Sequence, residues 1–159
     1  MENKERAFGF ALPPLSVGID LVEIAKIRKL FEHGKTLRES IFTPEELRHS
    51  WEQKKPYTSL AVFFAFKKAL FKALETGLGG TMDWRDVEIG KETDGTPVLH
   101  LCGETARVVE AIGVVEHAFC LSHTEEYGIA IVLLVGVALQ NSLDERVRFL
   151  VGARICYDF

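Results

Sequence analysis

The sequence has 159 residues, of which 47% are hydrophobic and 26% charged, and its net charge is −4. A chain of this length fits one domain, and its apolar content excludes a disordered protein. The acidic balance gives no electrostatic reason to expect a nucleic-acid ligand. We therefore predict a single domain over residues 1–159, with a loose N-terminal segment at residues 1–14.

The cysteines and apolar runs bear on where the protein works. Cys102, Cys120 and Cys156 are odd in number and lack CxxC spacing, which disfavours a zinc site or a disulfide framework and favours a reducing compartment. No signal peptide is apparent. The apolar run Ile129–Leu139 is shorter than the roughly 20 residues that a helix needs to cross a bilayer. We expect a buried strand there and a cytoplasmic protein with no membrane partner.

The first predicted strand runs from Ser16 to Asp20 and ends at this acidic residue. Apolar residues then recur at helical spacing between Leu21 and Phe31, which predicts a helix directly after Asp20. Asp20 would then cap that helix, the commoner role for an Asp at such a place, or face a cleft at the end of the strand.

Two further helices are indicated before the middle of the chain. Thr43, Pro44 and Glu46 stand at the cap, the first turn and three residues after the cap of the first, as in a capping box. A long helix follows from about Tyr57 to Thr76. Its apolar residues cover nearly the whole circumference, so we expect a central, buried helix that ends at Gly77.

The second half of the chain alternates strands with one helix. The predicted elements are a hairpin of Asp86–Ile89 and Pro97–Leu101 around a turn at Thr93–Thr96, a helix of Glu104–Ile112, and strands of His117–Ser122 and Gly128–Val135. In the less regular tail, Leu143–Leu150 fits a helix and Ala153–Tyr157 a strand. This order predicts an α+β fold with a mainly antiparallel sheet packed with the long helix.

Charged residues on the central helix and one histidine are the candidates for chemistry. Lys68 and Lys72 lie four residues apart and share a helix face, whereas Lys67 points elsewhere. Two ammonium groups beside an apolar helix suggest a phosphate or carboxylate ligand. His123, between Ser122 and Thr124 at a strand end, fits a general base or a phosphate contact. A turn histidine satisfied by the backbone is the commoner alternative.

Several segments, taken in order, carry a family resemblance. They are Gly18–Ile24, Ile41–Leu47, Phe64–Ala69 with Lys72, Thr76–Gly79, Trp84–Ile89, Gly95–Pro97 and Leu121–Thr124. Together they resemble the holo-acyl-carrier-protein synthase family of 4′-phosphopantetheinyl transferases. The resemblance covers about residues 17–134, so that residues 1–14 and 137–159 are extensions outside the family core.

The resemblance implies an activity. The family transfers the 4′-phosphopantetheine group of coenzyme A to a serine of an acyl carrier protein and releases adenosine 3′,5′-bisphosphate, usually with Mg²⁺. Its small bacterial members are homotrimers with the site between subunits. Positioning and cationic groups do most of the work in such a phosphoryl transfer. The family's carrier proteins are acidic, which implies a partner for Lys26 and Arg28; Lys26 stands where the family often has an arginine.

The family's site residues can be matched to this sequence. Asp20 matches the metal-binding aspartate, Lys72 the helix lysine that contacts phosphate, and His123 the histidine beside the coenzyme. The resemblance implies that these three residues are catalytic. The residues for which it implies contact with coenzyme A are Lys68, Lys72, Gly77, His123 and Thr124.

The sequence departs from the family at three positions. Lys68 replaces a glutamate that binds Mg²⁺ and helps to activate the serine, Phe63 replaces an arginine, and Glu75 replaces a common glycine. Because a hard cation prefers oxygen ligands, we expect that Mg²⁺ does not bind here in the family's way.

These departures leave three interpretations, in this order. The first is a transferase in which the Lys68 ammonium replaces Mg²⁺ and Glu23 or Glu75 supplies the lost base; Glu75 is seven residues from Lys68, roughly on its helix face. The second is a non-catalytic family member that binds coenzyme A or a carrier protein. The third is a structural subunit or an unrelated ligand binder.

Overall fold

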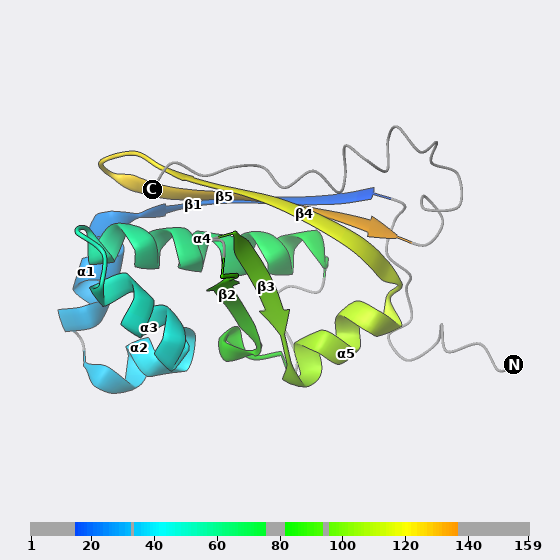
Figure 1. Cartoon of the computed structure of the whole chain (residues 1–159), viewed down its shortest axis with the longest axis horizontal. Coiled ribbons are helices and arrows are strands. Elements are labelled where there is room, and N and C mark those ends of the chain that lie inside the picture. The colour runs from blue at the N-terminus through cyan, green and yellow to red at the C-terminus, as the bar shows by residue number, and fades with distance from the viewer. Residues whose placement is uncertain (1–14, 33, 76–81, 94–95, 137–159) are drawn as a thin grey trace, which may run out of the picture.

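The computed structural model describes residues 15–32, 34–75, 82–93 and 96–136. A three-stranded sheet forms one layer and helices pack under it (Figure 1). The elements in order are β1 (Leu15–Glu23), α1 (Ile24–Glu32), α2 (Lys35–Ile41), α3 (Pro44–Trp51), α4 (Pro56–Ala73), the short 3-10 helix η2 (Trp84–Asp86), β2 (Val87–Lys91), β3 (Pro97–Leu101), α5 (Gly103–Ala111), β4 (Val114–His123) and β5 (Tyr127–Gly136). The expected α+β class is confirmed.

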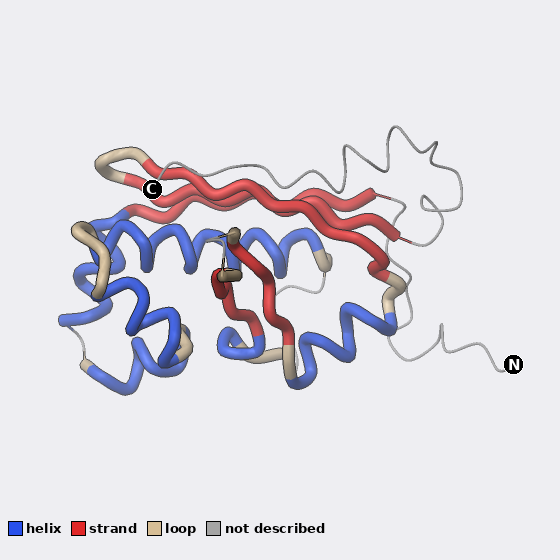
Figure 2. Tube along the Cα trace, in the orientation of Figure 1, coloured by secondary structure: helices blue, strands red, loops and turns tan. Residues whose placement is uncertain are grey.

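The larger sheet has the order β1-β5-β4, and β2 and β3 form a separate hairpin. Every strand pair is antiparallel, as predicted. Helix α4 runs along the inner face of the sheet (Figure 2). Burial alternates strictly along β1, so that Ser16, Gly18, Asp20 and Val22 face α4. Among the described residues, no helix is long and apolar enough to cross a membrane.

Strand β1 corrects the prediction that a strand ends at Asp20 and that this residue caps a helix. The strand continues to Glu23 and pairs with β5 along its whole length, and α1 begins only at Ile24. Buried and exposed side chains continue to alternate along the strand as far as Val22, which is buried and 5% exposed. The helical spacing that included Leu21 therefore coincided with a strand pattern, and Asp20 lies inside a strand, facing the central helix.

The central helix is confirmed in place and burial but not at its end. Helix α4 ends at Ala73 instead of near Thr76, and Glu75 has a left-handed backbone with φ of 59°. A non-glycine residue in this conformation costs about 1 kcal/mol or more, which explains why glycine suits this position. Because Glu75 lies beyond the helix, its expected place on the helical face of Lys68 is wrong.

Of the remaining predicted elements, some are confirmed and others lie outside the described residues. The hairpin is confirmed as β2 and β3, the next helix as α5, and the last two strands as the longer β4 and β5. Helix α2 was not predicted. The N-terminal segment at 1–14, Gly77, residues 94–95 of the hairpin turn, and the elements expected at 143–150 and 153–157 lie outside the described residues.

A buried ion pair joins α4 to its surroundings. Lys67 and Glu46 are both fully buried, and their Nζ and Oε2 atoms are 2.8 Å apart. Lys67 Nζ also donates to the carbonyl oxygens of Ile41, Trp84 and Val87 at 3.0, 2.9 and 2.7 Å. Burial raises the pKa of Glu46 and lowers that of Lys67, because desolvation disfavours both charges, while their mutual attraction opposes these shifts.

The predicted capping box is present and contributes to the same cluster. Glu46 N donates to Thr43 Oγ1 at 3.2 Å, and Thr43 N donates to Glu46 Oε2 at 3.0 Å. Glu46 Oε1 accepts from Ile89 N at 3.4 Å. One carboxylate thus caps α3, pairs with α4 and contacts β2.

Glycine at position 18 allows β1 to lie directly on α4. A Cβ atom there would be 1.8 Å from the carbonyl oxygen of Ala69 and 2.8 Å from the nitrogen of Ala73. Neighbouring Ser16 Oγ donates to the carbonyl oxygen of Ala73 at 2.5 Å. This close approach determines how near Asp20 lies to the side chains of α4.

We expect the Lys67→Met variant to lose about 3–5 kcal/mol of unfolding free energy, because Glu46 would stay buried without its counter-charge. Urea unfolding followed by circular dichroism measures this loss. Lys68→Met, a neighbouring and partly exposed position, is the matched control and should lose about 1 kcal/mol or less. Equal losses in the two variants would show that the buried pair is not the source.

We expect Gly18→Ala to destabilise the fold by about 1–3 kcal/mol, because the added methyl group meets backbone atoms that cannot rotate away. Val17→Ala, one residue away on the exposed face, should lose less. Thermal unfolding of the two variants beside the parent protein tests this, and an unchanged midpoint for Gly18→Ala would contradict the close packing of β1 on α4.

Candidate active site

Strand β1 and helix α4 bring together Asp20, Lys68 and Lys72, three of the residues singled out from the sequence. Lys68 Nζ lies 3.0 Å from Asp20 Oδ1, and Lys72 Nζ lies 3.0 Å from Asp20 Oδ2. The backbone nitrogen of Leu21 also donates to Asp20 Oδ1 at 2.7 Å, and Lys72 Nζ donates to the carbonyl oxygen of Ile19 at 3.1 Å. Both carboxylate oxygens therefore have cationic partners.

The electrostatics of this cluster favour an anionic ligand. Burial alone would raise the pKa of Asp20, but the Lys68 and Lys72 ammonium groups and the Leu21 amide beside it hold the pKa below its ordinary value. The carboxylate is thus ionised at neutral pH, and with two ammonium groups the cluster carries one net positive charge. The Asp20 side chain is 5% exposed, whereas those of Lys68 and Lys72 are 35% and 57% exposed. The positive groups are the ones that solvent reaches.

A magnesium ion does not fit this cluster. Mg²⁺ needs oxygen ligands at about 2.1 Å, yet the single carboxylate here is engaged by two ammonium groups. Repulsion between two unit charges about 4 Å apart is on the order of 4 kcal/mol at an intermediate dielectric. Within the described part of the chain, no group of three or more His, Cys, Asp or Glu side chains could hold a metal ion.

Neither glutamate considered as a replacement base joins the cluster. Asp20 is on the inner face of β1, and the alternation of the strand places Glu23 on the other face. The Oε2 atom of Glu23 is 3.4 Å from Lys26 Nζ. Glu75 follows the end of α4 in a left-handed conformation. The base proposed from these two residues is therefore not supported.

His123 lies on the inner face of the same sheet but at its opposite edge. Asp20 aligns with Ala130 of β5 and, through it, with Leu121 of β4, which places His123 two strands and two residues away. Strands are about 4.8 Å apart, so the separation is about 10 Å or more. Within one chain, the structure does not bring His123 to Asp20.

The other residues matched from the family have structural contacts or lie outside the description. Thr124 Oγ1 accepts from the backbone nitrogens of Glu126 and Tyr127 at 3.2 and 3.0 Å, which orders the turn between β4 and β5. His123 Nδ1 lies 3.2 Å from the carbonyl oxygen of Thr124, so a turn-like backbone contact is also present. Gly77 lies outside the described residues.

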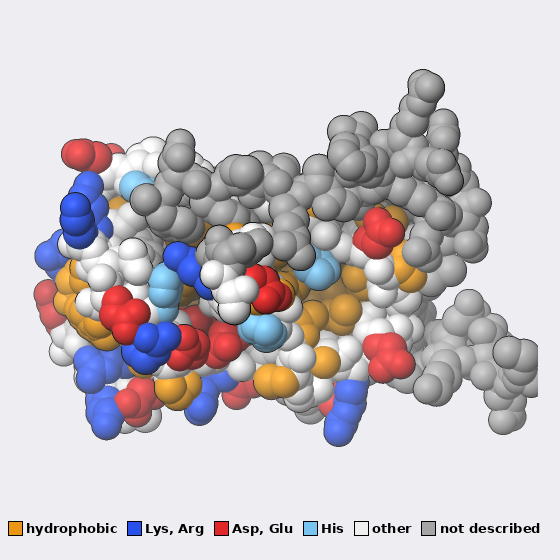
Figure 3. All heavy atoms as spheres, in the orientation of Figure 1, with side chains coloured by type: hydrophobic (Ala, Val, Ile, Leu, Met, Phe, Trp, Pro, Cys, Tyr) orange, Lys and Arg blue, Asp and Glu red, His pale blue; other side chains and the backbone are white. Residues whose placement is uncertain are grey.

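The basic residues of α1 lie on a surface of mixed charge. Lys26 is 3.4 Å from Glu23, and the guanidinium of Arg28 lies 4.8 Å from the ring centroid of Tyr57. Figure 3 shows Lys and Arg side chains interspersed with Asp and Glu at the end of the molecule formed by α1, α2 and α3. The Lys26 side chain is 77% exposed.

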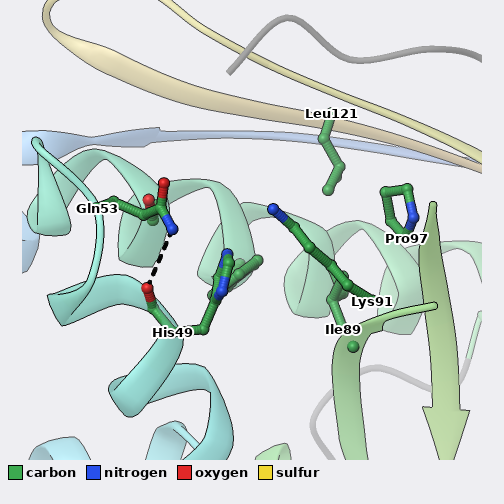
Figure 4. Close-up of a pocket in the computed structure, with 9 residues that line it drawn as sticks. His49, Gln53, Ile89, Lys91, Pro97 and Leu121 are labelled. Carbon is green, nitrogen blue, oxygen red and sulfur yellow. Dashed lines mark hydrogen bonds between the residues drawn. The ribbon is translucent and has the colours of Figure 1, made fainter. Parts of the chain in front are cut away.

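A small pocket, which the sequence did not predict, lies on the other side of α4. Its lining includes His49, Gln53, Phe63, Ile89, Lys91, Pro97 and Leu121, from α3, the loop after it, α4, the hairpin and β4 (Figure 4). Burial and the neighbouring Lys91 ammonium lower the pKa of His49. Phe63 is five residues before Lys68, or about 140° around the helix, so the pocket and the lysine cluster occupy different faces.

Comparison with known proteins identifies the family. Residues 16–132 match the 4′-phosphopantetheinyl transferase superfamily. A holo-[acyl-carrier-protein] synthase of Syntrophotalea carbinolica is 40% identical over 127 residues, 79% of this chain and 99% of that protein. The synthase of the same name from Koribacter versatilis is 35% identical over 121 residues, 76% of this chain and 97% of that protein.

Solved structures agree. The Chronobacterium ammoniagenes ACPS-CoA complex is 29% identical, with a TM-score of 0.68, and the match covers 78% of this chain and 98% of that one. The Helicobacter pylori holo-[acyl-carrier-protein] synthase in complex with coenzyme A is also 29% identical, with a TM-score of 0.64 and coverage of 74% and 98%. The chain therefore belongs to the 4′-phosphopantetheinyl transferase superfamily.

Proposed function

We propose that this protein transfers the 4′-phosphopantetheine group of coenzyme A to a serine of an acyl carrier protein and releases adenosine 3′,5′-bisphosphate. The observation that carries this proposal is the convergence of Lys68 and Lys72 on Asp20 at the sheet edge, which leaves a positive site open to solvent. The names of the relatives, holo-[acyl-carrier-protein] synthases, support transfer rather than binding alone.

The transfer reaction needs positive charge beside the departing phosphate, and the lysine cluster supplies it. The serine oxygen forms a bond to the phosphorus that carries the pantetheine arm, and the bond from that phosphorus to the bridging oxygen breaks. Negative charge grows on the departing bisphosphate, so ammonium groups placed beside it stabilise the transition state. Lys72 and Lys68 take this role, with Asp20 between them. His123, at the end of β4, accepts the serine proton.

We propose that the protein works as a homotrimer. The cluster at β1 and His123 at β4 lie at opposite edges of one sheet, so a neighbouring subunit can complete each site. The outer face of the sheet is apolar: Leu15, Val17, Ile19, Leu21 and Ile131 are 41–58% exposed. A contiguous apolar surface of this kind favours association between copies.

We propose that coenzyme A lies beside the end of β4, in contact with His123 and Thr124, as the family resemblance implies. His123 is two residues after Leu121, which lines the small pocket that His49 and Lys91 also line. His123 would thus link the coenzyme to the transfer step.

We also propose a docking surface for the carrier protein and a compartment for this protein. An acidic carrier protein would dock on the α1 surface through Lys26 and Arg28, whose charges face solvent or an aromatic ring. The structure has Cys102 and Cys120 as free thiols, which supports a reducing, cytoplasmic location.

We expect the purified protein to add one 4′-phosphopantetheine group to an apo-acyl carrier protein when coenzyme A is supplied, as measured by intact-protein mass spectrometry. Lys72→Ala should slow labelling by about a hundredfold, because a charge that stabilises the leaving group is lost. Arg107→Ala, on α5, is the control and should keep the parent rate. A carrier panel that gains no mass with the parent protein would contradict the proposed activity.

A further inference from the structure

We propose that Lys68 and Lys72 bind the pyrophosphate of coenzyme A directly in this protein, with no divalent cation between protein and ligand. This inference rests on the proposed function, since it concerns how the same site holds its substrate. It is carried by the donor set of the cluster: one buried carboxylate whose two oxygens both contact ammonium groups.

The charges of the cluster leave a cation no place and an anion a suitable one. Asp20 contributes one negative charge, and the two lysines contribute two positive charges. A divalent cation would have to displace Lys68 and Lys72 from Asp20 and would then sit beside both ammonium groups. A pyrophosphate, in contrast, would bring negative charge to two ammonium groups whose combined charge of +2 is only half neutralised by Asp20.

Hydrogen-bond capacity points the same way. An ammonium group has three N–H donors. Among the described residues, Lys68 Nζ donates a hydrogen bond to Asp20 and lies 5.7 Å from the ring centroid of Phe64. Lys72 Nζ has Asp20 and the carbonyl oxygen of Ile19. Donors therefore remain on both groups for ligand oxygens, on side chains that solvent reaches.

The spacing of the two lysines suits a ligand with two linked phosphoryl groups. Their positions, four apart on α4, place both Nζ atoms 3.0 Å from one carboxylate. Two phosphoryl groups that share a bridging oxygen can thus contact one ammonium each. The negative charge that the ligand brings would also relieve the mutual repulsion of Lys68 and Lys72.

The test is the affinity of the full-length protein for coenzyme A, measured by isothermal titration calorimetry with EDTA and again with excess Mg²⁺. We expect the two dissociation constants to agree within about twofold. A tenfold or greater loss of affinity in EDTA would overturn the inference. Binding in EDTA without labelling of any carrier would contradict the proposed function alone, and no binding in either buffer would contradict both.

Variants identify the groups that replace the cation. Lys68→Gln should weaken binding of coenzyme A in EDTA by about tenfold or more, because a charge-assisted hydrogen bond is lost. Dephospho-coenzyme A, which keeps the pyrophosphate, should show the same loss, whereas adenosine 3′,5′-bisphosphate, which lacks it, should not. Arg107→Gln removes one charge from α5 and should change none of these affinities. An equal effect of Lys68→Gln on all three ligands would overturn the assignment.

The Lys68→Glu variant reverses the charge at position 68 and should make binding of coenzyme A depend on Mg²⁺. In Lys68→Glu, two carboxylates face each other, so binding of coenzyme A should fall at least tenfold in EDTA and recover with Mg²⁺. Circular dichroism checks that this variant is folded, and Lys68→Gln tests the inference if it is not. A folded Lys68→Glu protein that binds coenzyme A equally well in both buffers would show that residue 68 does not set the metal requirement.

Discussion

The buried ion pair between Lys67 and Glu46 is the interaction on which the rest of the structure depends, because it fixes how α4 is turned about its axis. Lys67 Nζ is held by Glu46 and by backbone carbonyls at the end of α2, in η2 and in β2. The next residue, Lys68, lies about 100° further around the helix. It therefore faces β1, where Asp20 lies. The buried Lys67–Glu46 pair takes no part in the proposed reaction, yet it determines the direction in which Lys68 points.

The site combines the family's frame with a different balance of charge. Gly18 lets β1 approach the backbone of α4, which brings Asp20 within reach of two lysines. Where the family resemblance implies a carboxylate, this chain has Lys68, and its ammonium contacts the aspartate that a metal would need. Replacement of the cation by a cationic side chain preserves attraction for phosphate while it removes the metal's ligands. The departure is therefore compatible with the same transfer reaction.

Local signals in the sequence predicted well, and long-range ones did not. The capping box at Thr43 and the all-round apolar pattern of α4 are encoded in neighbouring residues, so both were predictable. The end of β1 was mispredicted because alternation and helical spacing coincide near Leu21. The burial of Lys67 and the distance of His123 from Asp20 depend on packing and strand order, which residue spacing does not contain.

The central claim is that ammonium groups, not a metal ion, meet the pyrophosphate in this protein. The most direct measurement is a crystal structure of the protein with coenzyme A, grown with excess Mg²⁺ so that the ion has every opportunity to bind. The account predicts pyrophosphate oxygens within hydrogen-bond distance of Lys68 Nζ and Lys72 Nζ, and no metal ion on Asp20. A magnesium ion bridging Asp20 and the pyrophosphate, with Lys68 turned away, would contradict it.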